Sequence, residues 1–452
     1  MSIVARDDLS LFDILLTPVY IFIILMIAHF IKVRNIESKP EYKYFMYGLM
    51  AKMLGAVALG MVYFFYYEDG GDTTNYYESA RAYVNLFFKD TGDFFYGWLG
   101  DATGKDYYFF DDTTGYSIYR HRDSHAFFVV RLLIPIMAAS FNSYFTCAIL
   151  VATITYTGVW KLYQTFVQEF PHLRRQLAIA ILFVPSCVFW GSGLMKDSFT
   201  LAGVGWYSYS FYWFLIRKQR KPVYAIQLVV SAVVLISIKP YILFALLPGS
   251  IIWLSNQQIK KISNRTFRMF MAPFLLTVGV IGAYFSLVQL GDSLGVYKVD
   301  TVLEQAVVIQ QDMKAEYYGG KSFDLGNFDA SVTGVAAKAP MAIFSGIFRP
   351  GLWDVKNVIM FVSSLENSYI LLLTLFLLIR LKFLGFFTLV GKNPLLLFSM
   401  LFSLFFAFSV GLTVANFGSL VRLRIPELPF FVAGLFILRD LYEKRSGRKV
   451  RF

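Results

Sequence analysis

Long apolar runs separated by short polar connections make up most of the chain. A helix needs about 20 mostly apolar residues to cross a bilayer, and runs of this length predict about eleven spanning helices. These lie near residues 11–31, 44–67, 141–160, 175–192, 198–216, 222–238, 241–256, 268–288, 357–379, 393–412 and 423–439. We therefore expect an all-α, polytopic transmembrane helical bundle that forms one domain over residues 1–452.

Every second connection between these runs is basic. Examples are the connection with Arg217, Lys218, Arg220 and Lys221, the one with Lys260, Lys261, Arg265 and Arg268, and the tail with Lys444, Arg445, Arg448, Lys449 and Arg451. Cytoplasmic loops of membrane proteins carry such an excess of lysine and arginine. The pattern predicts a multi-pass protein of the plasma membrane, in a bacterium the inner membrane, with its N-terminus outside and its C-terminus in the cytoplasm.

Two long connections fall on the outer side, residues 68–140 and 289–356. Between Tyr67 and Ser124 the first of them has eleven acidic and five basic residues. Its last part, residues 126–140, is apolar but short and contains Arg131. We expect this part to lie along the membrane surface as an interfacial helix.

Composition indicates lipid rather than water as the main solvent. Hydrophobic residues make up 57% of the chain and charged residues 16%, which is unusual for a water-solvated globular protein. The net charge of +12 fits basic loops held against anionic lipid headgroups, so no nucleic-acid partner is expected. Cys147 and Cys187 lie in apolar runs and are expected to be buried packing residues, without a disulfide framework or a zinc site.

An acidic segment with two glycines opens the first outer loop directly after an apolar run. It reads Glu68-Asp69-Gly70-Gly71-Asp72-Thr73-Thr74-Asn75-Tyr76-Tyr77-Glu78. The glycines permit a tight backbone path that turns Asp72 toward the membrane, where its carboxylate would act as a general base toward a hydroxyl acceptor. The alternative is an acidic, solvated end of a helix.

Two lysines interrupt the apolar middle of the chain on the same outer side. Lys196 and Asp197 follow a Gly-Ser-Gly turn between two predicted helices, and a lysine beside a helix start suits a phosphate oxyanion. The alternatives are a structural Lys196–Asp197 pair and snorkelling of the lysine to the membrane surface. Lys239 precedes Pro240, which breaks an apolar run; a bound anion and snorkelling explain it equally well.

The last third of the chain contributes arginines and one carboxylate. Arg349 precedes Pro350, Arg422 and Arg424 lie near the start of the final apolar run, and Glu366 lies inside another run. A charge within the membrane needs a partner, so Glu366 is expected to pair with one of these arginines. Arginine binds diphosphates and carboxylates through two parallel hydrogen bonds, which makes Arg422 and Arg424 candidate ligand-binding residues. A buried structural ion pair is the alternative.

Three motifs resemble the GT-C superfamily, integral membrane glycosyltransferases that use polyprenyl-phosphate-linked sugars. The segment Asp72-Thr73-Thr74-Asn75-Tyr76 is similar to the Asp-x-x-x-Tyr pattern in the first outer loop of these enzymes. The segment from Arg422 to Pro426, followed by Pro429, is similar to their Arg-Tyr-x-x-Pro-x-x-Pro run, with Leu423 in place of the tyrosine. The turn Gly191-Ser192-Gly193-Leu194-Met195-Lys196-Asp197 resembles a Lys-Glu or Lys-Asp turn of some relatives.

The resemblance implies inverting transfer of a sugar to a hydroxyl of a glycan, lipid or protein acceptor. Asp72 would then be the catalytic base, with Glu78 and Tyr76 shaping its surroundings. The donor phosphate would be held by Lys196, Lys239, Arg349, Arg422 and Arg424, with Asp69, Asp197 and Glu366 in support. Some relatives need a divalent cation, which Asp69 and Asp72 would hold, but no metal site is expected here. In the family the first outer loop usually follows the first helix, whereas here one more helix precedes it.

Other interpretations stay open. A polysaccharide polymerase or ligase of the Wzy type would also work at the outer face, on polyprenyl-diphosphate-linked glycans, and would rely on the basic residues rather than on Asp72. A transporter or lipid flippase would use Glu366 and Lys239 along a translocation path. A non-catalytic subunit of an envelope assembly is the third alternative.

Overall fold

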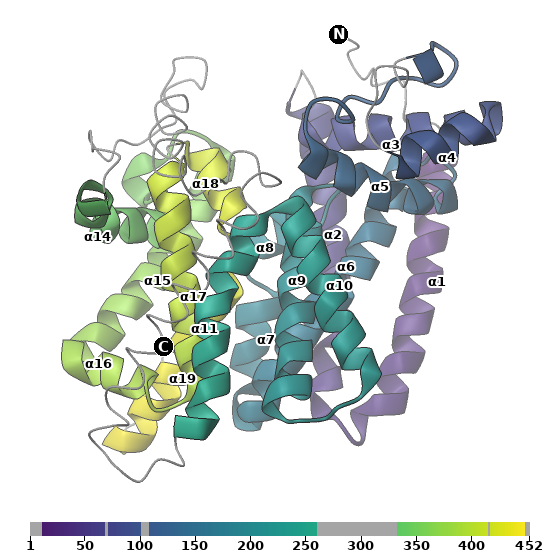
Figure 1. The fold of residues 1–452 in the computed structure, drawn as a ribbon. Helices are drawn as coiled ribbons and strands as arrows, with labels where there is room; N and C mark the ends of the chain where they lie inside the picture. The colour runs from purple at the N-terminus through teal and green to yellow at the C-terminus, as the bar shows by residue number, and fades with distance from the viewer. Residues whose placement is uncertain (1–10, 68–70, 101–107, 260–331, 415, 448–452) are drawn as a thin grey trace. The chain divides into compact units, whose positions relative to one another are not determined.

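The computed structural model describes residues 11–67, 71–100, 108–259, 332–414 and 416–447, and it contains helices and no β-strand within these ranges (Figure 1). The chain divides into two compact units, which are described separately. Unit 1 comprises Met1–Gln164, Cys187–Trp206 and Val233–Lys239, and unit 2 comprises Thr165–Ser186, Tyr207–Ala232 and Pro240–Phe452. The predicted span near 268–288, much of the second outer loop and Asp69 lie outside the described residues.

Five of the described helices are long and apolar enough to cross a membrane. They are Leu15–Ile36, Pro40–Phe65, Tyr144–Glu169, Val358–Leu381 and Pro394–Thr413. Shorter apolar helices are Ser124–Ala139, Pro222–Ile238, Pro240–Ser255 and Ala337–Phe348. The all-helical class is confirmed and a bilayer environment is supported, whereas the number of about eleven spans stays a prediction.

Unit 1 combines long helices with three helices that lie across their ends. It contains α1 (Leu11–Ile36), η2 (Pro40–Tyr44), α2 (Phe45–Phe65), α3 (Asp72–Lys89), α4 (Thr91–Leu99), α5 (Ser124–Ala139) and parts of α6 (Tyr144–Glu169), α8 (Pro185–Trp190), α9 (Lys196–Phe211) and α10 (Pro222–Ile238). In Figure 1, α3, α4 and α5 run across one end of α1, α2 and α6. Residues 126–139 belong to α5. The position along the membrane surface expected for residues 126–140 stays a prediction.

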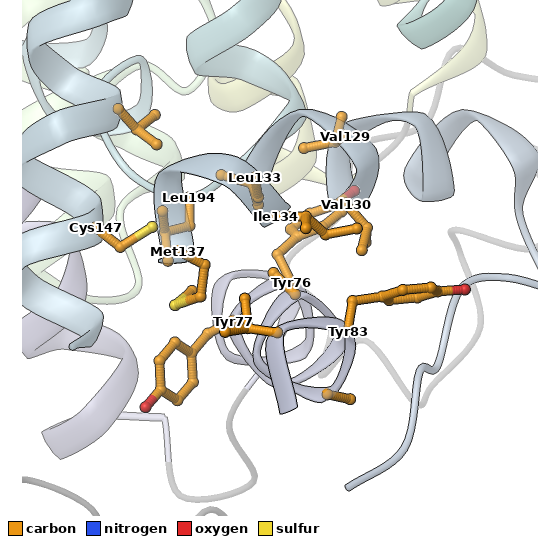
Figure 2. Close-up of a cluster of buried hydrophobic side chains, with 14 of the residues drawn as sticks. Tyr76, Tyr77, Tyr83, Val129, Val130, Leu133, Ile134, Met137, Cys147 and Leu194 are labelled. Atoms are coloured by element: carbon orange, nitrogen blue, oxygen red, sulfur yellow. The ribbon is translucent and has the colours of Figure 1, made fainter. Parts of the chain in front are cut away.

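A cluster of buried apolar side chains joins α3 and α5 (Figure 2). Its labelled members are Tyr76, Tyr77 and Tyr83 of α3, Val129, Val130, Leu133, Ile134 and Met137 of α5, Cys147 of α6 and Leu194 from the turn before α9. The tyrosines recur at helical spacing, so one face of α3 is buried. Cys147 and Cys187 are both buried and unbridged, which confirms their prediction as packing residues.

Unit 2 is built mainly from the second half of the chain. It contains η4 (Pro171–Leu173), α7 (Arg174–Leu182), the π-helical segment η5 (Tyr212–Ile216), α11 (Pro240–Ile259), α14 (Val332–Phe348), η9 (Leu352–Asp354), α15 (Val358–Leu381), α16 (Phe383–Val390), α17 (Pro394–Thr413), α18 (Phe417–Leu423) and α19 (Leu428–Ser446). A Cβ at Gly411 of α17 would lie 2.0 Å from the Ala342 carbonyl oxygen of α14. Glycine therefore lets these two helices meet backbone to backbone, as is common in membrane bundles.

Proline sets two of the helix boundaries. The break predicted at Pro240 is confirmed, because α10 ends at Ile238 and α11 begins at Pro240. The final helix, however, begins at Leu428 rather than near residue 423. The residue before a proline is disfavoured in a helix, so α18 ends before Pro426 and α19 starts with Pro429 in its first turn. Arg422 and Arg424 consequently belong to the end of α18.

Candidate functional site

Asp72 begins α3 and is half-buried. Thr74 accepts a hydrogen bond from the Gly71 N–H over 2.9 Å and donates one to the Gly71 carbonyl over 2.8 Å. A side chain at Gly71 would collide with Tyr63, because its Cβ would come within 2.6 Å of the ring. The glycine therefore lets α3 start against α2, with Asp72 at a helix end where a carboxylate is favoured.

The residues after Asp72 hold the start of α3 in place. Thr73 and the Tyr144 hydroxyl share a hydrogen bond of 2.7 Å. Tyr76 is buried and stacks on Tyr119, with ring centroids 4.7 Å apart. Glu78 is half-buried, and its position six residues after Asp72 puts it on a different face of the helix. Tyr76 thus supports the start of α3, while Glu78 points elsewhere.

Lys196 is the first residue of α9 and pairs with a carboxylate that the sequence analysis did not single out. Its ammonium group lies 2.7 Å from Oδ2 of Asp123. The other oxygen of Asp123 caps α5 by accepting a 2.9 Å hydrogen bond from the Ala126 N–H. The Lys196 side chain is 18% exposed and that of Asp123 is 40% exposed. Lys196 therefore pairs with Asp123 and not with Asp197, the partner considered from sequence.

The charge state of Asp123 follows from these contacts. Burial raises the pKa of its carboxyl group, but the hydrogen bonds from Lys196 and the Ala126 N–H, with the positive charge of Lys196, outweigh burial. The net result is a pKa below the ordinary aspartate value. Asp123 is therefore ionised at neutral pH and carries a full negative charge next to Lys196.

Lys239 forms a second, closed ion pair. Its ammonium group makes a short contact with Oδ1 of Asp197, and the two side chains are 6% and 0% exposed. Lys239 follows the C-terminus of α10 and Asp197 lies in the first turn of α9, so each charge lies at the helix end that favours its sign. This internal pair was not among the explanations expected for Lys239, a bound anion and snorkelling.

Apolar residues beside each of these polar groups belong to one hydrophobic cluster. The cluster includes Tyr76 of α3, Ala126 of α5, Leu194 and Phe199 around the start of α9, and Ile238 of α10. His125 adds a polar link, because its Nδ1 lies 2.8 Å from the Ser237 carbonyl oxygen. The helix ends of unit 1 that carry Asp72, Asp123, Lys196 and Lys239 are therefore held on a shared core.

Lys52 is a further buried cation of unit 1 that was missed from sequence. It lies midway along the span Pro40–Phe65 and is 4% exposed. Its ammonium group donates a short hydrogen bond to the carbonyl of Gly191, in the turn between α8 and α9. A lysine inside an apolar run of membrane length is a recognised sign of function or of a specific partner, and that sign was present in the sequence.

In unit 2, Arg424 is completely buried. It donates hydrogen bonds to the carbonyls of Ile347, over 2.8 Å, and Arg349, over 2.9 Å, and makes a short hydrogen bond to Oδ1 of Asn367. Its Nη2 lies 4.0 Å from Oε1 of Glu366. Arg424 is therefore the arginine that accompanies Glu366, in the geometry of the buried structural pair that the sequence left open.

The other two arginines of unit 2 have different surroundings. Arg349 makes a two-point ion pair with Asp354, at 3.1 Å and 2.7 Å, and its guanidinium lies over the ring of Phe417. Arg422 is half-buried in the last turn of α18. The two candidate ligand-binding residues near the end of α18 thus differ, because Arg424 is enclosed and Arg422 is partly exposed.

The predicted site residues divide between the two units. Unit 1 holds Asp72, Tyr76, Glu78, Lys196, Asp197 and Lys239, and unit 2 holds Arg349, Glu366, Arg422 and Arg424. No group of three or more His, Cys, Asp or Glu that could hold a metal occurs among the described residues. The candidate site is the polar group of unit 1 with Asp72, Asp123, Lys196, Asp197 and Lys239.

Comparison of the chain with protein-family models, with curated proteins and with solved structures gave no match. The resemblance to the GT-C superfamily consequently rests on three short motifs.

Proposed function

We propose that the chain is a membrane glycosyltransferase of the GT-C type. It would move a sugar from a polyprenyl-phosphate-linked donor to an acceptor hydroxyl at the outer face of the plasma membrane, with the N-terminus outside and the C-terminus in the cytoplasm. The long apolar helices support a bilayer environment. The choice of reaction is supported by the three motifs and by the arrangement of charges around Lys196.

The observation that carries the proposal is the position of Lys196. A helix N-terminus bears a partial positive charge and disfavours a cation, yet Lys196 is the first residue of the 16-residue helix α9. The start of α5 faces the same lysine, through its N-cap Asp123. The N-termini of α5 and α9 and the ammonium group of Lys196 therefore all favour an anion next to Lys196. The phosphate of the sugar donor is such an anion.

In the structure the carboxylate of Asp123 occupies that place. The pair is partly exposed, so a phosphate headgroup can replace the carboxylate on Lys196. Asp123 need not uncap α5 when this happens, because Oδ1 binds the Ala126 N–H while Oδ2 binds Lys196. The Lys239–Asp197 pair is enclosed and fixes the start of α9 from the other side.

The reaction needs a base and a stabilised leaving group. Asp72 accepts the proton of the acceptor hydroxyl, whose oxygen attacks the anomeric carbon of the sugar. The bond between that carbon and the phosphate oxygen breaks, and the polyprenyl phosphate leaves with the bonding electrons. Lys196 stabilises the charge that develops on the leaving phosphate, which is commonly the larger contribution to the rate.

Turnover by the purified protein in nanodiscs tests this assignment. The substrates are polyprenyl-phosphate-linked sugars with short glycan acceptors, and transfer is followed by mass spectrometry. We expect Asp72→Asn to lower turnover by about 10²–10⁴-fold while binding of the donor is retained. Asp93→Asn is the matched control, because Asp93 is a half-buried acid in the first turn of α4, as Asp72 is in the first turn of α3.

Loss of donor binding together with turnover in Asp72→Asn, or equal turnover in both variants, would contradict the role of Asp72. Extension of a polyprenyl-diphosphate-linked glycan, without transfer from monophosphate donors, would favour the polymerase or ligase instead. Absence of transfer from every donor would remove the enzymatic proposal.

A transporter or flippase is the second candidate, favoured by Lys52. A buried cation halfway along an apolar span, bonded to the turn between α8 and α9, often marks a substrate or ion pathway. Movement of a fluorescent polyprenyl phosphate between leaflets of sealed vesicles distinguishes the candidates. A transporter would lose this movement in Lys52→Met, whereas a transferase would show none.

A further inference from the structure

Glu427 is a carboxyl group enclosed by the helices of unit 2. It immediately precedes α19 and is 1% exposed. No hydrogen bond of standard geometry reaches either carboxyl oxygen, although the N–H of Ala407 on α17 lies near the group. An ionised carboxyl group in such surroundings is strongly unfavourable unless a cation is paired with it.

The charged groups around Glu427 do not balance if both nearby carboxyl groups are ionised. Arg424, three residues earlier, supplies one positive charge, and Glu366 lies 4.0 Å from it. Glu366 also accepts a 2.8 Å hydrogen bond from the Ser186 N–H, which favours its ionised form. Arg422 is on α18 but is only half-buried. One buried guanidinium therefore faces two buried carboxyl groups.

The helices packed against α19 bring no second cation to this end of it within the described residues. Both α16 and α17 lack titratable side chains. The arginines of α7, Arg174 and Arg175, are in its first turn, directly after η4. His172 of η4 lies 2.9 Å from Asp440, so this basic end faces the far end of α19.

The remaining titratable groups of α15 are also distant or exposed. Arg380 lies in the last turn of α15, about 20 Å along the helix from Glu366 at the rise of an α-helix. Tyr369 is half exposed. Neither provides a positive charge for Glu427.

We propose that Glu427 holds a proton, so that Arg424, Glu366 and Glu427 form a neutral group with one exchangeable proton inside unit 2. The species that this group of three side chains binds and releases is a proton. Whichever carboxyl group is paired with Arg424, the other requires the proton. The site takes no part in the glycosyl transfer proposed for unit 1 and is independent of it.

Carbodiimide labelling of the full-length protein in nanodiscs tests the proposal. A protonated carboxyl group adds to an apolar carbodiimide such as dicyclohexylcarbodiimide: its oxygen bonds to the central carbon, its proton moves to nitrogen, and rearrangement gives a stable N-acylurea without a leaving group. We expect modification of Glu427 by this reagent and not by a water-soluble carbodiimide, as read by peptide mass spectrometry. Glu427→Gln should fold normally and lose the label.

The decisive variant is Glu366→Gln. Without the Glu366 charge, Glu427 becomes the anion that accompanies Arg424, gives up its proton and loses its reactivity. Glu443→Gln is the matched control on α19, where Glu443 pairs with Arg439 at 3.0 Å, and it should leave the label on Glu427 unchanged. No label in the wild-type protein, unchanged labelling in Glu366→Gln, or failure of Glu427→Gln to fold would each overturn the proposal.

Discussion

Charged side chains that lie among apolar helices are paired differently in the two units. In unit 1 each lysine of the candidate site has its own carboxylate, and the Lys196–Asp123 pair is partly exposed. In unit 2 Arg424 is completely enclosed and bonds to backbone carbonyls and Asn367. An open pair allows an outside anion to replace one partner, whereas an enclosed group is committed to holding helices together.

Among the variants that test this difference between the units, Arg424→Met is expected to cause the largest loss of stability. The substitution removes the donor from two carbonyls and Asn367 and leaves Glu366 without its cation. Removal of one partner from a buried ion pair costs about 3–5 kcal/mol, so we expect a large fall in the thermal unfolding temperature in detergent. Arg422→Met, two residues away and half-buried, should cost about 1 kcal/mol or less. Equal effects of the two would show that Arg424 is not structural.

The second effect contrasts Lys196 with Lys239 of unit 1. Lys239→Met leaves Asp197 charged and buried and is expected to cost about 3 kcal/mol of stability, which the double variant with Asp197→Leu should largely restore. Lys196→Met should cost less than about 1 kcal/mol but weaken binding of polyprenyl monophosphate by about tenfold or more. Unfolding scans and binding titrations separate these outcomes. Similar stability losses for both lysines would contradict the distinction between an open and an enclosed pair.

Much of the local structure could be predicted from sequence, but the pairing of side chains could not. Apolar length located α2, α15 and α17, and Pro240 marked a helix end, because both depend on nearby residues alone. The partner of Lys239 lies 42 residues away and that of Lys196 lies 73 residues away. The packing of the helices determines which carboxylate pairs with each lysine. The patterns in a single sequence do not reveal this packing.

Three charged residues with defined roles in the fold were not predicted from the sequence. Lys52 was overlooked because its neighbours are uniformly apolar, although isolation in such a run is itself informative. Asp123 was counted only as one of many loop acids, yet an aspartate just before an apolar run is a common helix N-cap. Glu427 stands between two prolines and was read as part of a motif. For Lys52 and Glu427 burial decided the role of the charge, and burial is a property of the folded chain.

A smaller effect is expected at Asp123, which competes with the phosphate for Lys196. Asp123→Ser keeps a side chain able to cap α5 and removes the competing charge, so polyprenyl monophosphate should bind about fivefold more tightly, the equivalent of an exposed ion pair. Asp90→Ser is the matched control, because Asp90 caps α4 through the same 2.9 Å bond to a backbone N–H. Weaker binding in Asp123→Ser would mean that Asp123 contacts the ligand instead of competing with it.

The smallest expected effect is the pH dependence of the stability that the partly exposed Lys196–Asp123 pair contributes. The pKa of Asp123 is lower in the folded protein than the ordinary value of about 4. A carboxyl group with a lowered folded pKa adds stability above its unfolded pKa, and this contribution disappears as the pH falls through the folded pKa. The difference in unfolding temperature between wild type and Asp123→Ser should therefore be constant from about pH 5 to 8 and shrink below about pH 4. A difference that already disappeared near neutral pH would show that another group controls the Lys196 pair.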